Sequence, residues 1–111
     1  MIYHLARVHD WAAALAAGEY RISTLGRTLD EVGFIHASSA EQLSGVAERF
    51  YRDELQQLVV LQVDDAGLDV RWEDVGTGEL FPHVYGPIHP ADVLNIIPAH
   101  FEHNGGFVLE R

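Results

Sequence analysis

The sequence predicts an α+β fold: a single domain, residues 1–111, with a twisted, mainly antiparallel sheet and two helices in its first half. A chain of 111 residues, of which 48% are hydrophobic and 22% charged, has the size and balance of one compact domain. Apolar residues recur at helical spacing only in the first half. The second half shows β-branched runs and alternating segments between glycines and prolines, which predict strands.

The chain is expected to begin with a strand and a helix. Residues 1–6 are mostly apolar and favour extended structure, and His4 lies among them. Asp10 can cap the helix that follows, and Gly18 stands where a left-handed residue ends a helix. This helix is therefore the first of the two.

Residues 19–32 have no clear period, so the sequence predicts an irregular flap there. Arg21 and Arg27 lie in this segment together with serine and threonine hydroxyls, and they can contact an anionic ligand when the flap closes. The plainer interpretation is that loops are commonly rich in these residue types.

A second strand and helix are expected next. Residues 33–36 are a short strand candidate that contains His36. Ser38 and Glu41 have the spacing of a capping box, which predicts that a helix begins there. Apolar residues at helical spacing within residues 43–50 give this helix one buried stripe.

The remaining elements are expected to be strands. Residues 58–63 form a nearly continuous apolar run, which is typical of a strand covered on both faces at the centre of a sheet. Residues 70–73 alternate, and residues 93–97 form a last strand. The tail around residues 107–109 either pairs as a hairpin or frays.

Composition and missing motifs exclude several classes of protein. The chain has no cysteine, which excludes disulfides and thiol nucleophiles, and its charge of −10 disfavours binding to polynucleotides. It shows no P-loop, GxGxxG, GxSxG or HExxH pattern. The start lacks a basic leader, and no apolar run approaches about 18 residues. An acidic cytoplasmic protein without a membrane partner is therefore expected.

Two of the seven histidines occupy similar places in the predicted fold. His4 and His36 each lie in a strand that a helix follows, so we expect both in one sheet, facing a common crevice. For either histidine alone, a core position with a hydrogen bond to the backbone is an equally good interpretation.

A second group of polar side chains lies between glycines and prolines. Glu79, His83 and Tyr85 share one face if the segment is a strand. Glu79 can then act as a general base or orient a hydroxyl, with His83 as its partner. The alternative is an edge segment whose rings cover the core. Nearby, Arg71, Trp72 and Glu73 can supply a charged and aromatic wall to a pocket, whereas a salt-bridged surface strand is the favoured interpretation of Arg71 and Glu73 alone.

Three motifs together, residues 2–5, 33–38 and 78–86, resemble the bacterial domain of unknown function 952 family over nearly the whole chain. In motif order that family is similar to the ADP-ribosyltransferase superfamily, above all to the branch of RNA 2′-phosphotransferases, which use two strand histidines. The resemblance implies an ADP-ribosyltransferase-like fold, NAD as the cofactor and no metal. The chain departs from many such enzymes in the residues that follow His4.

The resemblance also implies roles for particular side chains. His4 would hold ribose hydroxyls of NAD, His36 would line the nicotinamide side, and Glu79 would stabilise positive charge as nicotinamide leaves. The complete implied set has catalytic residues His36, Glu79 and His83, and cofactor-binding residues Tyr3, His4, Ser38 and Tyr85.

Three functions stay open at this point. The first is binding of NAD or an ADP-ribose-type nucleotide, with transfer of ADP-ribose to a small nucleotide or a protein acceptor. The second is a non-enzymatic module that binds a small molecule or a protein. The third is a divalent-metal enzyme that uses His4, His36 and either Glu79 or His83.

Overall fold

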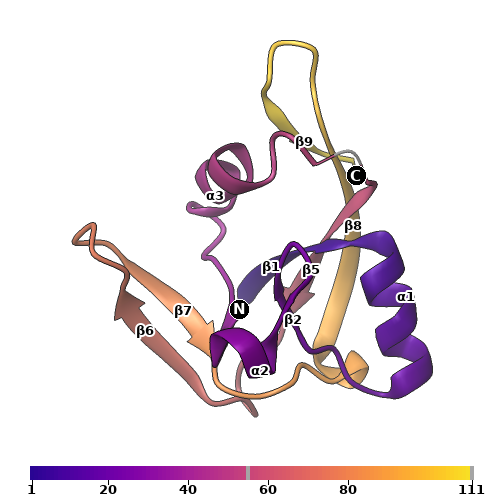
Figure 1. Ribbon diagram of the computed structural model, residues 1–111, viewed down its shortest axis with the longest axis vertical. Helices are drawn as coiled ribbons and strands as arrows, with labels where there is room; N and C mark the ends of the chain where they lie inside the picture. Colours follow the sequence, from indigo (N-terminus) through magenta and orange to yellow (C-terminus); the bar gives the residue numbers. More distant parts are fainter. Residues whose placement is uncertain (55, 111) are drawn as a thin grey trace.

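The structure, a computed structural model, describes residues 1–54 and 56–110. Its elements are β1 (Ile2–Arg7), α1 (Val8–Ala17), β2 (Ile22–Thr24), β3 (Arg27–Thr28), α2 (Leu29–Val32), β4 (Ile35–His36), α3 (Leu43–Phe50), β5 (Leu58–Val63), β6 (Val70–Asp74), β7 (Leu80–Val84), the 3-10 helix η1 (Pro90–Asp92), β8 (Val93–Phe101) and β9 (Phe107–Leu109). The strands form a four-stranded sheet ordered β1-β5-β8-β9, a three-stranded sheet ordered β4-β7-β6 and the β2-β3 hairpin (Figure 1). These pairings are all antiparallel, which confirms the α+β prediction.

Strand β5 lies inside the four-stranded sheet, as its apolar run predicts. It pairs with β1 on one side and with β8 on the other. Its side chains alternate between two cores: Val59, Leu61 and Val63 belong to one, and Leu58 and Val60 belong to the other. A strand buried on both faces needs no polar alternation, which explains the run.

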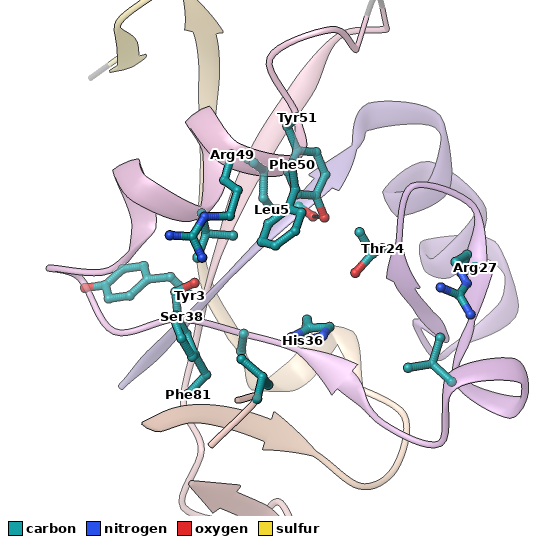
Figure 2. A pocket seen from close by; sticks show the side chains of 14 residues that line it. Tyr3, Leu5, Thr24, Arg27, His36, Ser38, Arg49, Phe50, Tyr51 and Phe81 are labelled. Atoms are coloured by element: carbon teal, nitrogen blue, oxygen red, sulfur yellow. Dashed lines mark hydrogen bonds between the residues drawn. The ribbon is translucent and has the colours of Figure 1, made fainter. Parts of the chain in front are cut away.

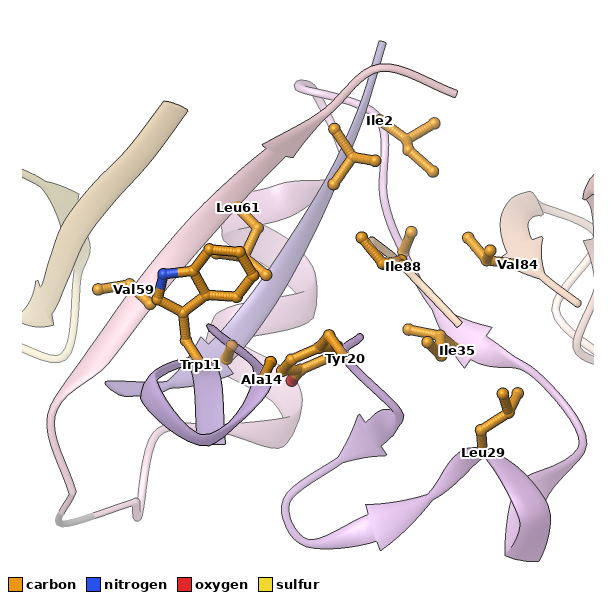
Figure 3. Packing of buried hydrophobic residues seen from close by; sticks show 13 residues of the cluster. Ile2, Trp11, Ala14, Tyr20, Leu29, Ile35, Val59, Leu61, Val84 and Ile88 are labelled. Carbon is orange, nitrogen blue, oxygen red and sulfur yellow. The ribbon is translucent and has the colours of Figure 1, made fainter. Parts of the chain in front are cut away.

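Two helices cover the opposite faces of this sheet (Figure 1). Figure 3 shows Trp11 and Ala14 of α1 in the core that contains Val59 and Leu61. On the other side, α3 buries the apolar stripe that the sequence predicts, although its last residue, Phe50, is exposed. Among the described helices, none combines the length and the apolar character needed to span a membrane.

The helix ends differ from the predictions in two places. Gly18 ends α1 in the left-handed conformation as expected, with φ 86°. However, α1 begins at Val8, so that Asp10 lies in its first turn instead of capping it. No capping box forms at Ser38, because its backbone N–H and C=O both pair with Tyr3 of β1, each at 2.8 Å. This pairing keeps Ser38 extended, and α3 starts further along.

The prediction of irregular structure for residues 19–32 is wrong. The segment contains the β2-β3 hairpin and the short helix α2. A capping box between Thr28 and Glu31 starts α2, which gives the domain a third α-helix. The hairpin turns through Leu25 and Gly26, both with positive φ. Two- and three-residue strands are too short to show a period, which is why the sequence pattern missed them.

The tail and the β6-β7 hairpin extend the fold beyond the predicted strands. Strand β8 continues to Phe101 and pairs with β9, so the hairpin interpretation of the tail is the correct one. The β6-β7 hairpin projects from the rest of the molecule (Figure 1). Together with β4, it forms a sheet separate from that of β1.

The expectation that His4 and His36 share one sheet is therefore wrong. His4 lies on β1 of the four-stranded sheet, and His36 lies on β4 of the three-stranded sheet. The two sheets meet at an isolated bridge between Tyr3 and Ser38. The strands are too short to merge further, because β4 has only two residues.

His4 joins these parts of the fold through both of its ring nitrogens. Its Nδ1 lies 2.5 Å from the carbonyl oxygen of His36, and its Nε2 lies 2.9 Å from the hydroxyl of Tyr20. A carbonyl only accepts, so Nδ1 carries the proton, and Nε2 accepts from the tyrosine. Tyr20 in turn pairs through its backbone with Ile88. His4 is thus a core histidine with a hydrogen bond to the backbone.

Burial lowers the pKa of His4 from 6.5 to about 4, against a smaller opposite effect of the bond to His36. Because the folded-state pKa is depressed, the stabilising contribution is present above 6.5 and is lost as the pH falls towards 4. We therefore expect the wild-type protein to lose about 3 kcal/mol more of its unfolding free energy across this range than His4→Gln does. Urea unfolding of both proteins at several pH values measures this difference, and parallel pH profiles would contradict it.

Candidate functional site

A cavity of about 250 Å³ lies between α3, β4 and the β2-β3 hairpin (Figure 2). Its walls are mostly apolar and aromatic, and its polar groups are few. The lining residues are Tyr3, Leu5, Thr24, Arg27, Val32, His36, Ala37, Ser38, Val46, Arg49, Phe50, Tyr51, Val75 and Phe81. Such a concave, largely apolar site with a small number of polar groups is typical of small-molecule pockets.

The cavity carries two arginines that have no carboxylate partner. All seven basic residues of the chain are arginines. Four of them form ion pairs: Arg7, Arg21, Arg52 and Arg71. Within residues 1–54 and 56–110, Arg27 and Arg49 form none, and both line the cavity. In Figure 2 their guanidinium groups lie on opposite sides of the space, with His36 between them.

His36 presents its ring to this cavity. Its backbone is fixed on both sides, because its N–H donates to Ser23 Oγ at 3.3 Å and its carbonyl oxygen accepts from His4. Among the described residues, neither ring nitrogen has a hydrogen-bond partner. Burial, and then the nearby His83, lower the pKa of His36. The ring is therefore neutral and free to contact a ligand.

Behind His36 lies a cluster of rings formed by Phe34, His36, His83 and Tyr85, which we call the ring cluster. Phe34 stacks on His83 with ring centroids 3.9 Å apart, and His36 meets the same ring edge-to-face at 4.8 Å. Register positions the two histidines, since His36 of β4 pairs with His83 of β7. The ring cluster therefore joins the cavity wall to the three-stranded sheet.

Glu73 of β6 holds the ring cluster at its outer side. One of its carboxylate oxygens, Oε1, accepts from His83 Nδ1 at 2.9 Å and also from the hydroxyl of Tyr85. The bonds from Tyr85 and then His83 lower the pKa of Glu73, and the same carboxylate raises the pKa of Tyr85. Because Nδ1 donates, Nε2 of a neutral His83 is an acceptor. This Nε2 atom is buried without a partner.

The structure brings some of the predicted site residues together and separates others. Tyr3, His36 and Ser38 line the cavity. His83 and Tyr85 belong to the adjoining ring cluster and do not line it. His4 does not line the cavity either, because it is buried with both ring nitrogens engaged in hydrogen bonds.

The predicted pairing of Glu79 with His83 is wrong. Glu79 is exposed just before β7, where its Oε2 accepts from Gln42 Nε2 at 3.0 Å. The β6-β7 register, with Glu73 opposite Phe81, instead places Glu73 within reach of His83. Cross-strand neighbours of this kind cannot be read from spacing along one strand.

The prediction of a salt-bridged surface strand holds for Arg71 but not for Glu73, which accepts hydrogen bonds from His83 and Tyr85. Arg71 pairs with Asp69 at 3.0 Å and lies over the ring of Tyr85 at 4.2 Å. The sequence does not predict Phe34 or Arg49 as parts of the site, whereas Glu73 lies in the segment that can supply a pocket wall. Of the two cavity arginines, the sequence indicates only Arg27, because it lies in the segment predicted to contact an anionic ligand.

The described residues contain no group of three or more histidine, aspartate or glutamate side chains able to hold a metal ion. The divalent-metal hypothesis needs His4 as a ligand together with His36. Both ring nitrogens of His4 are engaged in hydrogen bonds, so it has no lone pair to offer a metal without breaking one of them.

Comparisons with known proteins give a family and solved structures. A family model described as "Protein of unknown function (DUF952)" matches residues 5–96. A search of curated proteins found no match. The X-ray structure of protein CC0527 from Caulobacter crescentus is similar at 30% identity and a TM-score of 0.83, over 96% of this chain and 92% of that one. Its solution NMR structure gives 30% identity and a TM-score of 0.76, over 95% and 89% of the two chains.

An experiment can distinguish whether Glu73 or Glu79 bonds to the ring cluster. In Glu73→Gln we expect the pKa of Tyr85 to fall back towards its ordinary value, because the carboxylate that holds the phenolic proton is gone. Glu79→Gln is the matched control and should leave the tyrosine titration unchanged. Ultraviolet absorbance of the tyrosines against pH measures both. A shift in Glu79→Gln alone would show that the wrong carboxylate has been assigned.

Proposed function

The chain belongs to the DUF952 family of proteins of unknown function, and we propose that its cavity binds an ADP-ribose-type nucleotide, NAD included. The observation that carries the proposal is the pair of arginines, Arg27 and Arg49, on opposite sides of an otherwise apolar cavity. Guanidinium groups without a carboxylate partner are suited to phosphate oxygens, which they bind in a bidentate manner.

The overall charge makes this placement informative. With seventeen acidic residues against seven arginines, a carboxylate partner is easily available at most places on the surface. Two unpaired arginines on one cavity create a local positive site in a protein of charge −10. Such a site favours a small anion, because a long polyanion would also meet the acidic surface around it.

The other lining residues fit the rest of a nucleotide. Tyr3, Phe50 and Phe81 offer aromatic surface for a base, and the hydroxyl of Ser38 is available to a ribose oxygen. A volume of about 250 Å³ is below the roughly 300–1,000 Å³ of pockets for drug-sized ligands. We therefore infer that one base and its ribose enter the cavity and that the diphosphate lies at the arginines.

The proposal covers binding and gives Glu79 no part in a transfer reaction. Glu79 does not line the cavity, and no carboxylate does so among the described residues. The ADP-ribosyl-transfer mechanism suggested by the family resemblance needs a carboxylate beside the anomeric carbon. His36 is the group at the cavity that can exchange a proton. Tyr3, His36 and Ser38 are the predicted residues retained here as ligand contacts.

Substitution of the two arginines tests the proposal. We expect Arg27→Gln and Arg49→Gln each to weaken ADP-ribose binding by about 10-fold, since a charged hydrogen bond to phosphate is lost. Arg52→Gln is the control. Arg52 lies just after α3, the helix that carries Arg49, but it pairs with Glu48 and does not line the cavity. Isothermal titration calorimetry with ADP-ribose, NAD and nicotinamide measures the affinities.

Two outcomes would overturn the proposal. One is the absence of any heat of binding with ADP-ribose and NAD at millimolar concentration. The other is an equal loss of affinity in Arg52→Gln, which would show a general charge effect. Binding of nicotinamide with no gain from the diphosphate would favour a module for an uncharged small molecule instead.

A further inference from the structure

We propose that His36 is the acid–base residue of the cavity, which takes up a proton when an anionic ligand binds, and that His83, held by Glu73, positions its ring. The proposal rests on the proposed function, because it needs phosphate near Arg27 and Arg49. It adds a proton to the binding reaction and gives a role to the buried His83 and to its hydrogen bond with the half-exposed Glu73.

His36 is the lining residue whose charge can change near neutral pH. The two arginines keep their charge. The hydroxyl of Tyr3 accepts from Gln62 at 3.2 Å, and that of Tyr51 lies 3.4 Å from the carbonyl oxygen of Leu5. Of the imidazoles in the described chain, only that of His36 lines this cavity. A proton exchanged with a ligand there is therefore exchanged by His36.

The backbone and the ring of His36 are both held by neighbouring residues. Its backbone carbonyl is held by His4, and its N–H is held by Ser23. The rings of Phe34 and His83 pack against it at centroid distances of 5.1 and 4.8 Å. These contacts restrict the rotation of the ring, which lines the cavity.

His83 is itself locked by Glu73 and by the stacked ring of Phe34. The result is a fixed order from the surface to the cavity: Glu73, His83, His36. The buried Nε2 of His83 has no donor, although an unsatisfied buried acceptor is costly. It belongs to the ring against which His36 packs edge-to-face. A positioning role explains why this cost is retained.

Charged and titratable groups face His36 from four elements. Arg27 of β3 and Arg49 of α3 stand at the cavity, His83 of β7 lies behind with Glu73 beyond it, and His4 of β1 lies at its carbonyl. Burial, and then His83, disfavour a proton on His36 in the free protein and lower its pKa. A diphosphate between the arginines supplies negative charge and reverses this preference.

The sign of the linkage follows from this reversal. Ligand binding raises the pKa of His36, so binding takes up a proton and affinity rises as the pH falls. A rise of one unit makes the affinity about 10-fold higher at low pH than at high pH. ADP-ribose is the suitable probe, since its diphosphate is esterified on both sides and has no proton to exchange in this range.

Calorimetry with ADP-ribose between about pH 5.5 and pH 8 tests the proton linkage. We expect about 10-fold tighter binding by the wild type at the lower pH, and no pH dependence in His36→Gln. His100→Gln is the control, because that exposed ring contacts Glu110 and does not line the cavity. A pH dependence that survives in His36→Gln would overturn the inference and leave the proposed function standing.

Histidine NMR of the free protein tests the positioning residues independently of ligand. We expect His83→Phe, which keeps a ring in place, to raise the pKa of His36. We also expect His83 to carry its proton on Nδ1 in the wild type and to lose that preference in Glu73→Gln. An unchanged His36 titration in His83→Phe would refute the role of His83. If the wild type binds no ADP-ribose at either pH, both the proposed function and the proton linkage are refuted. The NMR experiment needs no ligand and would still decide the role of His83.

Discussion

The hydrogen bonds of the buried His4 ring are the interaction on which the site depends. This ring connects three segments that share no sheet: β1, which carries it, β4, whose carbonyl it holds, and the segment of Tyr20. Without it, the two-residue strand β4 would be tied to the larger sheet mainly by the bridge between Tyr3 and Ser38. The cavity lies at this junction, so a histidine buried away from the cavity fixes the place of one that lines it.

The two histidines show how similar sequence settings lead to opposite roles. Both follow apolar residues in short strands. His4 is enclosed by the core, which lowers its pKa to about 4, whereas His36 stays half-buried with its ring nitrogens unengaged. The difference arises from what each strand packs against, because β1 lies between two cores and β4 borders a cavity.

The long elements could be predicted from the sequence because their patterns are local. The run of β5 and the stripe of α3 each reflect burial along one element. The site could be predicted only in part. His36, Tyr3 and Ser38 stand at strand ends, where a position near a crevice can be inferred. Glu73 and Arg49 come to the site through strand register and helix packing, which join residues far apart in the chain and leave no trace in spacing.

The order of the strands has a consequence for how the chain is made. Strand β1 leaves the ribosome before the other elements of this domain, yet within the four-stranded sheet it pairs with β5, with Ile2 opposite Val63. The N-terminal strand and the apolar faces of α1 and α3 must therefore wait until most of the chain has been synthesised. Non-local pairing of this kind slows folding and exposes apolar surface meanwhile. The junction that forms the cavity is accordingly among the last parts of the molecule to be assembled.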